Sequence, residues 1–390
     1  MKVAKSTVIA ALVGVPIIAV GSLYLVKFLT NLPAKASVKE LLSAGIELCE
    51  KEQYAEGRAK LEECYQKASD EELRNQALLH LSRCYTAQQD AEKAVESWNK
   101  VLANAAMTDR HSEAHYSLGL LLSAGDQQES RRGEMKQHYE KAVASGGETR
   151  YADLAEVALA RMMVQEGNLR GAEEALDRVR ARGKDYPSLK AAIFELNMKM
   201  LFSPIITKVP ASDYYVVKEG DSLDRISKTL GTTTELLQES NGITDPRRLQ
   251  IGKRIKVVTD KFRVEVLKSK KILRLLSGDV VLNEYPVGTG KFSSTPTGKF
   301  RISDRVKEPT WFKDGRVIPY GDPQNILGTR WMALKSTDEQ KELTGYGIHG
   351  TDDDSSIGKE SSQGCIRLLN RDVEELFKIL PVGTEVVIQD

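Results

Sequence analysis

The sequence predicts a multidomain fold: an all-α repeat region, then a small βααβ module, then a mostly-β domain. Three observations lead to this prediction. The 390 residues exceed one hydrophobic core, because single cores rarely grow past about 250–300 residues. Residues 38–200 are rich in helix-favouring Ala, Leu, Glu, Lys and Gln and repeat a pattern of small and bulky residues. Beyond residue 260, short apolar runs separated by turn residues indicate strands.

The composition is that of a globular protein. Hydrophobic residues make up 41% of the chain and charged residues 28%, which disfavours disordered and multi-span membrane classes. Lys and Arg (56) nearly balance Asp and Glu (55), so the net charge of +1 gives no general reason to expect a nucleic-acid partner. Four cysteines are too few for a disulfide scaffold.

Residues 1–36 are predicted to hold a membrane anchor. Residues 6–26 contain no charged side chain, and a helix of 21 residues spans roughly 30 Å, the thickness of a hydrocarbon core. Two lysines before this stretch favour a cytoplasmic N-terminus. A cleaved signal peptide is the alternative, because Ala34-Lys35-Ala36 has the small-x-small pattern of a cleavage site, and a buried helix is a third interpretation. Either of the first two places the rest of the chain outside the cytoplasm.

Residues 37–203 are expected to stack as pairs of helices. Small residues suited to helix crossings recur 37, 37 and 41 residues apart, at Gly45, Ser82, Gly119 and Ala160. This pattern resembles tetratricopeptide (TPR-like) repeats, with an insertion in the third unit. Two roles stay open for the region: a concave surface that binds a protein partner, or a spacer that holds the C-terminal part away from the membrane.

The cysteines and histidines of the helical region are interpreted as ordinary structural residues. The cysteines fall on apolar helix faces, where a disulfide is possible outside the cytoplasm but is not required by the spacing. The histidines lack metal-ligand spacing, so neither a metal nor a cofactor is expected. These residues are Cys49, Cys64 and Cys84, and His80, His111, His115 and His138.

A small module is predicted at residues 213–258, after a proline-containing linker at 204–212. A strand, two short helices and a returning strand, with Gly-Asp-Ser-Leu after the first strand and Leu-x-Ile-Gly-x-x-Ile at the end, closely resemble a LysM module. That family binds the N-acetylglucosamine-containing chains of peptidoglycan and chitin. The resemblance implies a glycan groove between two loops, formed by Gly220, Asp221, Ser222, Leu223, Asn241, Gly242 and Ile243. The two apolar residues of this set fit core positions equally well, and its aspartate or serine fits a helix N-cap.

Residues 259–390 are predicted to form a mostly-β domain with one clear helix at 372–380. The domain contains one histidine, His349, and one cysteine, Cys365, each set among glycines. A histidine can accept the proton of a thiol near neutral pH. Glycines let backbone amides approach a reacting carbonyl, as an oxyanion hole requires. The pair therefore predicts a cysteine nucleophile with a histidine base.

The pattern H-G-T-x-x-x-x-S-I-G-x-x-x-S-x-G-C-I-R at residues 349–367 resembles the YkuD-type L,D-transpeptidases, as do residues 295–300 and 322–332. The resemblance implies a catalytic β-sandwich that acts on a peptidoglycan tetrapeptide stem. The implied thiolate attacks the carbonyl at the L-centre of diaminopimelate, and D-alanine leaves. The amine of a second stem then resolves the thioester to a 3→3 cross-link.

The resemblance also implies a role for each matching residue. Cys365 is the nucleophile and His349 the general base, while the backbone carbonyl of Gly350 orients the imidazole. Backbone amides near Gly364 and Cys365 are the implied oxyanion donors. Arg367 either holds a substrate carboxylate or supports the loop.

Two features near His349 and Cys365 argue against a second base and against a metal site. Gln363 stands where many family members have a second histidine, and an amide cannot act as a base. The acidic run at 352–354 lacks the glycine and glutamate of a calcium loop, so it is expected to be a solvated loop face rather than a metal site.

The sequence as a whole predicts a peptidoglycan L,D-transpeptidase of the bacterial cell envelope. The inner-membrane anchor would leave the bulk of the chain in the periplasm, the LysM-like module would bind glycan strands, and the catalytic domain would act on peptide stems. Two alternatives stay open: an L,D-carboxypeptidase that uses water as acceptor, and a non-catalytic wall-binding scaffold.

Overall fold

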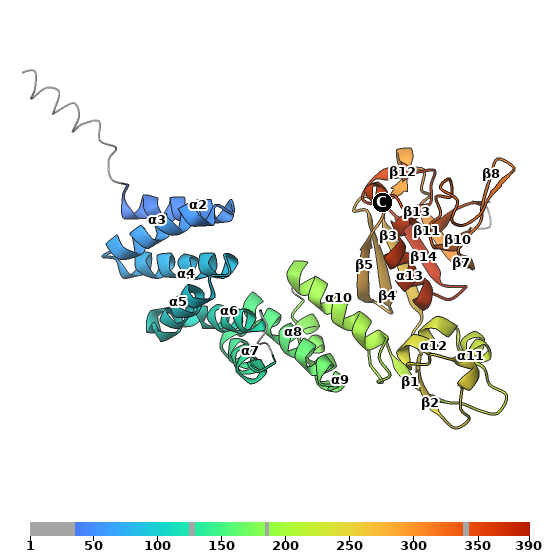
Figure 1. Ribbon diagram of the computed structural model, residues 1–390, viewed down its shortest axis with the longest axis horizontal. Coiled ribbons are helices and arrows are strands. Elements are labelled where there is room, and N and C mark those ends of the chain that lie inside the picture. Colours follow the sequence, from blue (N-terminus) through green and yellow to red (C-terminus); the bar gives the residue numbers. More distant parts are fainter. Residues whose placement is uncertain (1–35, 125–128, 184–186, 338–342) are drawn as a thin grey trace, which may run out of the picture. The chain divides into compact units, whose positions relative to one another are not determined.

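The computed structural model describes residues 36–124, 129–183, 187–337 and 343–390 (Figure 1). The chain forms two compact units, Met1–Ala124 and Gly125–Asp390. The predicted membrane-spanning stretch at 6–26 lies outside the described residues. Among the residues that are described, no helix has the length and apolar character needed to cross a membrane.

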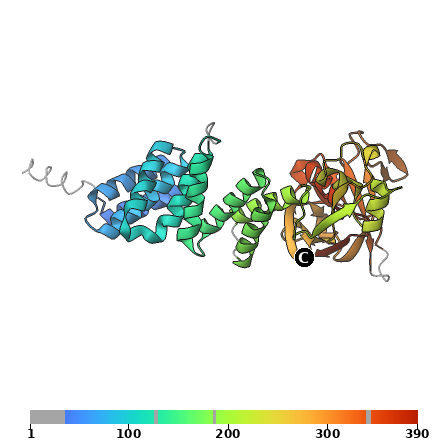
Figure 2. The ribbon, with the colours of Figure 1, turned by 90° about the horizontal axis from the view of Figure 1, so that it is seen from below.

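The described residues of the first unit, 36–124, fold into helices, as predicted, and each helix packs on the next (Figures 1 and 2). The small residues predicted at helix crossings are buried here: Gly45, Ser82 and Gly119. The elements are α2 (Val38–Glu50), α3 (Tyr54–Lys67), α4 (Glu71–Ala87), α5 (Ala91–Ala103), η1 (Ala105–Arg110) and α6 (His111–Ser123).

Two glycines set the close approach of α2 and α3. A methyl group added at Gly45 would lie 2.7 Å from Leu61 Cγ, and one at Gly57 would lie 2.6 Å from Cys49 Sγ and 2.9 Å from the Gly45 carbonyl oxygen. Real Cβ atoms do not approach other atoms so closely, and a packed interior has little room to move away. The two backbones therefore touch only because both positions are glycine.

Cys49 and Cys84 do more than pack: they form a disulfide that joins α2 to α4, which the sequence left open as possible but did not require. Their 35-residue separation in sequence gave no signal, since the partners meet only when the helices stack. Cys64 is a buried free thiol, as expected of a core residue.

The second unit begins with four more helices, α7 (Arg132–Gly146), α8 (Arg150–Gln165), α9 (Leu169–Ala181) and α10 (Pro187–Leu201). Ala160 of α8, the fourth predicted crossing residue, is fully buried. Arg182 pairs with the buried carboxylates of Asp153 and Glu156 and so ties the end of α9 to α8. α10 also contacts the β-rich part, where Asn197 Nδ2 donates to the Leu282 carbonyl oxygen at 3.1 Å.

The predicted βααβ order is confirmed in the next segment. The antiparallel strands β1 and β2 enclose two short helices, and the Ser222 hydroxyl caps the first helix by accepting from the Arg225 N–H at 3.2 Å. Gly231 ends that helix with a φ of +66°, a conformation that favours glycine. The elements are β1 (Ser212–Val216), α11 (Leu223–Leu230), α12 (Thr234–Ser240), η2 (Pro246–Arg248) and β2 (Arg254–Val258).

The C-terminal part is β-rich, but it is not the expected sandwich of two sheets. One eight-stranded sheet in the order β13-β11-β10-β7-β14-β3-β4-β5 curls into a nearly closed barrel. Its members are β3 (Phe262–Leu267), β4 (Ile272–Ser277), β5 (Val280–Pro286), β7 (Gly298–Lys307), β10 (Arg330–Ser336), β11 (Gly347–Thr351), β13 (Ile366–Leu369) and β14 (Glu385–Gln389). A strand pattern alone does not show which strands pair, so it could not separate the two architectures.

The predicted helix is present as α13 (Asn370–Ile379), two residues longer at its start. Val373, Leu376 and Phe377 are buried in the core, where α13 packs on the sheet. The remaining short elements are β6 (Thr289–Gly290), η3 (Lys291–Ser293), β8 (Trp311–Lys313), β9 (Arg316–Ile318), η4 (Asp354–Ser356) and β12 (Glu360–Ser362).

Substitution Gly57→Ala is expected to destabilise the first unit by roughly 1–3 kcal/mol, because the new methyl would overlap α2. Urea unfolding followed by circular dichroism measures the change. Gly133→Ala on α7 is the matched control, since nothing lies within 4 Å of its added methyl group. The control should be neutral or stabilising by up to about 1 kcal/mol, because Ala is the better helix former. Equal effects of the two substitutions would contradict the packing explanation.

Candidate active site

Parallel pairing of β11 with β13 brings His349 and Cys365 to one site. In this pair His349 lies opposite Arg367, and Cys365 immediately precedes β13. All three line a cavity of about 1030 Å³. Other residues of its wall are Trp331, Tyr346 and Phe312. His349 and Cys365 are 16 residues apart in the sequence, and the pairing of these two strands brings them to the same cavity.

A backbone hydrogen bond sets the orientation of the His349 ring. Its Nδ1 lies 2.7 Å from the Gly350 carbonyl oxygen, which can only accept, so Nδ1 carries the proton and Nε2 is left as the proton acceptor. The ring is 2% exposed and stacks on Trp331 with centroids 5.7 Å apart. Sequence reasoning placed Gly350 correctly beside the ring but did not single out Trp331.

Burial keeps the imidazole neutral. It lowers the pKa of His349 to about 4, against the opposing effect of the Gly350 carbonyl, while the positive charge of Arg367 lowers it further. The ring is therefore an unprotonated acceptor at neutral pH.

Burial also raises the pKa of the Cys365 thiol, and the Gly347 backbone and Arg367 offset this only in part. Cys365 is a free cysteine whose Sγ lies 3.6 Å from the Gly345 carbonyl oxygen. The resting pair is thus a neutral thiol beside a neutral imidazole, rather than a thiolate beside an imidazolium. The thiol has to lose its proton as it reacts.

A tight turn precedes Cys365 and requires glycine at 364. Gly364 has a φ of +131°, and an added methyl would lie 2.5 Å from the Tyr346 ring. The Gly364 N–H already donates to Ser362 Oγ at 3.1 Å, and the Ser362 hydroxyl donates to the Cys365 carbonyl oxygen at 2.7 Å. Of the two predicted oxyanion donors, only the Cys365 amide has no acceptor among the residues that the structure describes.

Asn370, at the start of α13, fixes the backbone around Gly350. Its Oδ1 accepts from the Thr329 N–H at 3.0 Å, and its Nδ2 donates to Asp352 Oδ1 at 2.6 Å. A methyl group added at Gly350 would overlap Asn370 Oδ1. The sequence carried no signal for this role, because the partners lie 41 and 18 residues away.

Arg367 presents unused hydrogen-bond donors in the cavity wall. Its Nη1 donates to Ser361 Oγ at 3.4 Å, and its Nε is buried with no acceptor among the described residues. It also forms no ion pair with a carboxylate of the described part of the chain. Gln363 is exposed at the cavity wall and, as an amide, supplies no base. The acidic run at 352–354 is exposed, in keeping with the predicted loop face.

The side chains of the predicted glycan groove are partly occupied inside their own module. Leu223 is 3% exposed in the module core, so its side chain is not available for a glycan. Asp221 accepts from the Lys218 N–H and from the Tyr215 hydroxyl, each at 2.8 Å, and so closes the first loop.

The second loop is held in the same way. Asn241 Nδ2 donates to the Lys256 carbonyl oxygen at 2.9 Å, and its Oδ1 accepts from the Lys256 N–H at 2.6 Å. Ile243 packs against the module core. The exposed members of the set are Gly220, Ser222 and Gly242. A glycan would therefore meet mainly backbone and small polar groups in these loops.

Comparisons with known proteins match the two C-terminal parts. A LysM domain model matches residues 215–258, and a model of the YkuD L,D-transpeptidase catalytic domain matches residues 261–388. The chain is 35% identical over 181 residues to "Putative L,D-transpeptidase YkuD" of Bacillus licheniformis, covering 45% of this chain and 97% of that protein. It is 38% identical over 128 residues to "Putative L,D-transpeptidase YqjB" of Bacillus subtilis, covering 33% and 70%.

Alkylation of Cys365 by iodoacetamide is expected to rise about tenfold per pH unit from about pH 6 to about pH 8, because the raised pKa of the thiol keeps the thiolate fraction small over this range. Peptide mass mapping follows Cys365 separately from the other free thiol, Cys64. A plateau that begins near neutral pH would instead indicate a thiolate–imidazolium pair and would contradict the neutral resting state.

Proposed function

The chain belongs to the YkuD family of L,D-transpeptidases, and we propose that it forms 3→3 cross-links in peptidoglycan. The observation that supports this most is that the half-buried Cys365 lines the same cavity as a His349 ring whose Nδ1–H donates to the Gly350 carbonyl oxygen. A nucleophile, a proton acceptor and a group that orients the acceptor are the parts that covalent acyl transfer needs.

In the first half-reaction Nε2 of His349 takes the thiol proton while Cys365 Sγ attacks the carbonyl carbon at the L-centre of diaminopimelate. The Cys365 amide, which lacks an acceptor among the described residues, supports the negative charge that develops on the carbonyl oxygen. The C–N bond to D-alanine then breaks, and the protonated ring returns its proton to the departing amine.

In the second half-reaction an amine of another stem attacks the thioester. Nε2 of His349 accepts the proton from this amine, the C–S bond breaks, and the thiol recovers that proton. A neutral His349, its pKa lowered to about 4, is the form that each half-reaction requires at its start. Water in place of the amine would make the enzyme an L,D-carboxypeptidase.

The rest of the chain supports a location in the cell envelope. We propose that the loops at 220–223 and 241–243 hold the glycan strand, and that residues 6–26 anchor the chain in the inner membrane with the bulk of it in the periplasm. The Cys49–Cys84 disulfide supports this location, because disulfides persist in oxidising compartments. The stacked helices fit TPR-like repeats that bind a partner or serve as a spacer. The same proposal includes the domain boundaries predicted from the sequence, in which the anchor segment, the helical repeats, the linker and the LysM module end at residues 36, 203, 212 and 258.

Incubation of the protein with purified tetrapeptide muropeptides should yield dimers that lack one D-alanine, detected by mass spectrometry. Cys365→Ala should yield none, because it removes the sulfur that carries the acyl group. Cys64→Ala is the matched control, since that buried thiol lies in the first unit, and it should retain activity. Tripeptide monomers alone would favour the carboxypeptidase, and no product from the unsubstituted chain would leave only the wall-binding scaffold.

Arg367→Gln is expected to lower kcat/KM about 10–100-fold, because a hydrogen bond to a charged group contributes about 1.5–3 kcal/mol. To find the cause of this loss, both the unsubstituted enzyme and the variant are also assayed with a stem whose terminal carboxylate is amidated. If Arg367 binds that carboxylate, the unsubstituted enzyme loses the same factor with the amidated stem and the variant loses little more. Equal further losses in both proteins would show that Arg367 acts by supporting the loop.

A further inference from the structure

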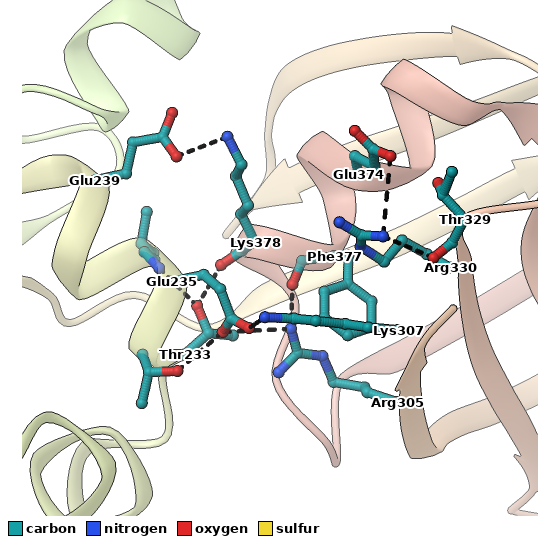
Figure 3. A network of polar contacts seen from close by, with 12 residues as sticks. Thr233, Glu235, Glu239, Arg305, Lys307, Thr329, Arg330, Glu374, Phe377 and Lys378 are labelled. Carbon is teal, nitrogen blue, oxygen red and sulfur yellow. Dashed lines mark hydrogen bonds and ion pairs between the residues drawn. The ribbon is translucent and has the colours of Figure 1, made fainter. Parts of the chain in front are cut away.

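Helix α12 of the LysM domain docks on the catalytic domain through ion pairs (Figure 3). Glu235 Oε1 lies 2.7 Å from Lys307 Nζ, and its Oε2 lies 3.7 Å from Arg305 Nη2. One turn further along α12, Glu239 Oε2 lies 2.6 Å from Lys378 Nζ. Burial raises the pKa of Glu235, but Lys307 and Arg305 outweigh that effect, so the carboxylate stays ionised.

The same contact has a buried apolar part. Leu236 is 1% exposed and belongs to the apolar cluster that includes Phe377 and Ile379 of the catalytic core. Beside it the buried Thr233 donates its hydroxyl to the Lys378 carbonyl oxygen. This buried part strengthens the Glu235–Arg305 pair most, because those two side chains are only 20% and 14% exposed, whereas the more exposed Glu239–Lys378 pair contributes less.

Two of the cations, Arg305 and Lys307, are also held by contacts within the catalytic domain itself. The Arg305 guanidinium lies 4.0 Å from the centroid of the Phe377 ring and donates to the Phe377 carbonyl oxygen. Lys307 lies over the same ring at 5.8 Å (Figure 3). Side chains that are already held in place lose little conformational entropy when they form ion pairs. The surface of the catalytic domain around Phe377 is therefore well suited to bind the carboxylates of α12.

A second attachment holds the LysM domain from β2. The Lys256 side chain is fully buried, and its Nζ donates to the carbonyl oxygens of Met200 at 2.8 Å and Leu201 at 3.4 Å, at the end of α10. The exposed residues of the predicted glycan loops, Gly220, Ser222 and Gly242, take part in neither attachment. The domain is therefore fixed on two sides while these loops stay at the surface.

We propose that the LysM domain is a fixed part of the catalytic unit, so that the glycan strand and the stem peptide bind in one constant register. This inference rests on the proposed function. A flexible tether would only raise the local concentration of all stems within reach. A docked module instead selects the stem that hangs at one set position along the bound strand, which favours glycan-linked stems over free peptide.

The test breaks the contact with Glu235→Lys combined with Glu239→Lys, which places cations against Arg305, Lys307 and Lys378. The rescue adds Lys307→Glu and Lys378→Glu, which restores two of the three ion pairs, 235–307 and 239–378, with reversed charges. Asp213→Lys combined with Asp279→Lys is the matched control, because it makes the same charge change at exposed positions outside α12, its ion-pair partners and the glycan loops. Amide hydrogen exchange over residues 233–240 and 373–380 reports whether the contact has opened.

The opened variant should exchange faster in both segments and still bind insoluble peptidoglycan. It should turn over free tetrapeptide as the unsubstituted enzyme does, yet lose at least about tenfold in rate on glycan-linked stems, with recovery in the rescue variant. Three results would overturn the inference: exchange that is already as fast in the unsubstituted enzyme, an unchanged rate of the opened variant on glycan-linked stems, or an equal loss on both substrates. An unsubstituted enzyme that is inert on both substrates would overturn the proposed function itself.

Discussion

The parallel pairing of β11 with β13 is the constraint on which the candidate site depends. Ile348 and Ile366 lie opposite each other in this pair and are buried in the core of the domain. Successive side chains of a strand point to opposite faces, so this burial turns His349 and Arg367 towards the cavity. Asn370 then leaves no room for a side chain at Gly350, whose carbonyl orients the ring. A shift of one residue in the register would bury the wrong side chains and dismantle the site.

The burial that positions the two reacting groups also keeps them neutral. A low pKa for His349 and a high pKa for Cys365 have the same main cause, the removal of water from both groups. Arg367 adds a positive charge to this wall and has no carboxylate partner in the described part of the chain. A substrate that brings its own carboxylate would pair with Arg367, which would favour a stem peptide over an uncharged ligand.

The near-zero net charge conceals ordered charge pairs between domains. Glu235 and Glu239 on α12 meet cations from two elements of the catalytic domain, residues 305 and 307 on β7 and residue 378 on α13. The sequence around each of these residues gives no sign of an ion pair, because charged side chains on a short helix or a strand are typical of a solvent-exposed face. The contact exists only after the sheet has brought β7 and α13 together, and it makes the glycan-binding module part of the site's geometry.

The sequence by itself determined the order of the parts: a helical region, the βααβ module and a β-rich domain with one helix. These follow from local patterns, since hydrophobic periodicity, turn residues and caps such as Ser222 act within a few residues. It also singled out His349 and Cys365 as the candidate base and nucleophile. Each is the one residue of its type in the C-terminal domain, and each is set among glycines. Only the tertiary structure decided the single curled sheet, the Cys49–Cys84 disulfide, the stacking of Trp331 on His349 and the role of Asn370. These depend on partners tens of residues apart, and such contacts form when packing, not local propensity, selects the neighbours.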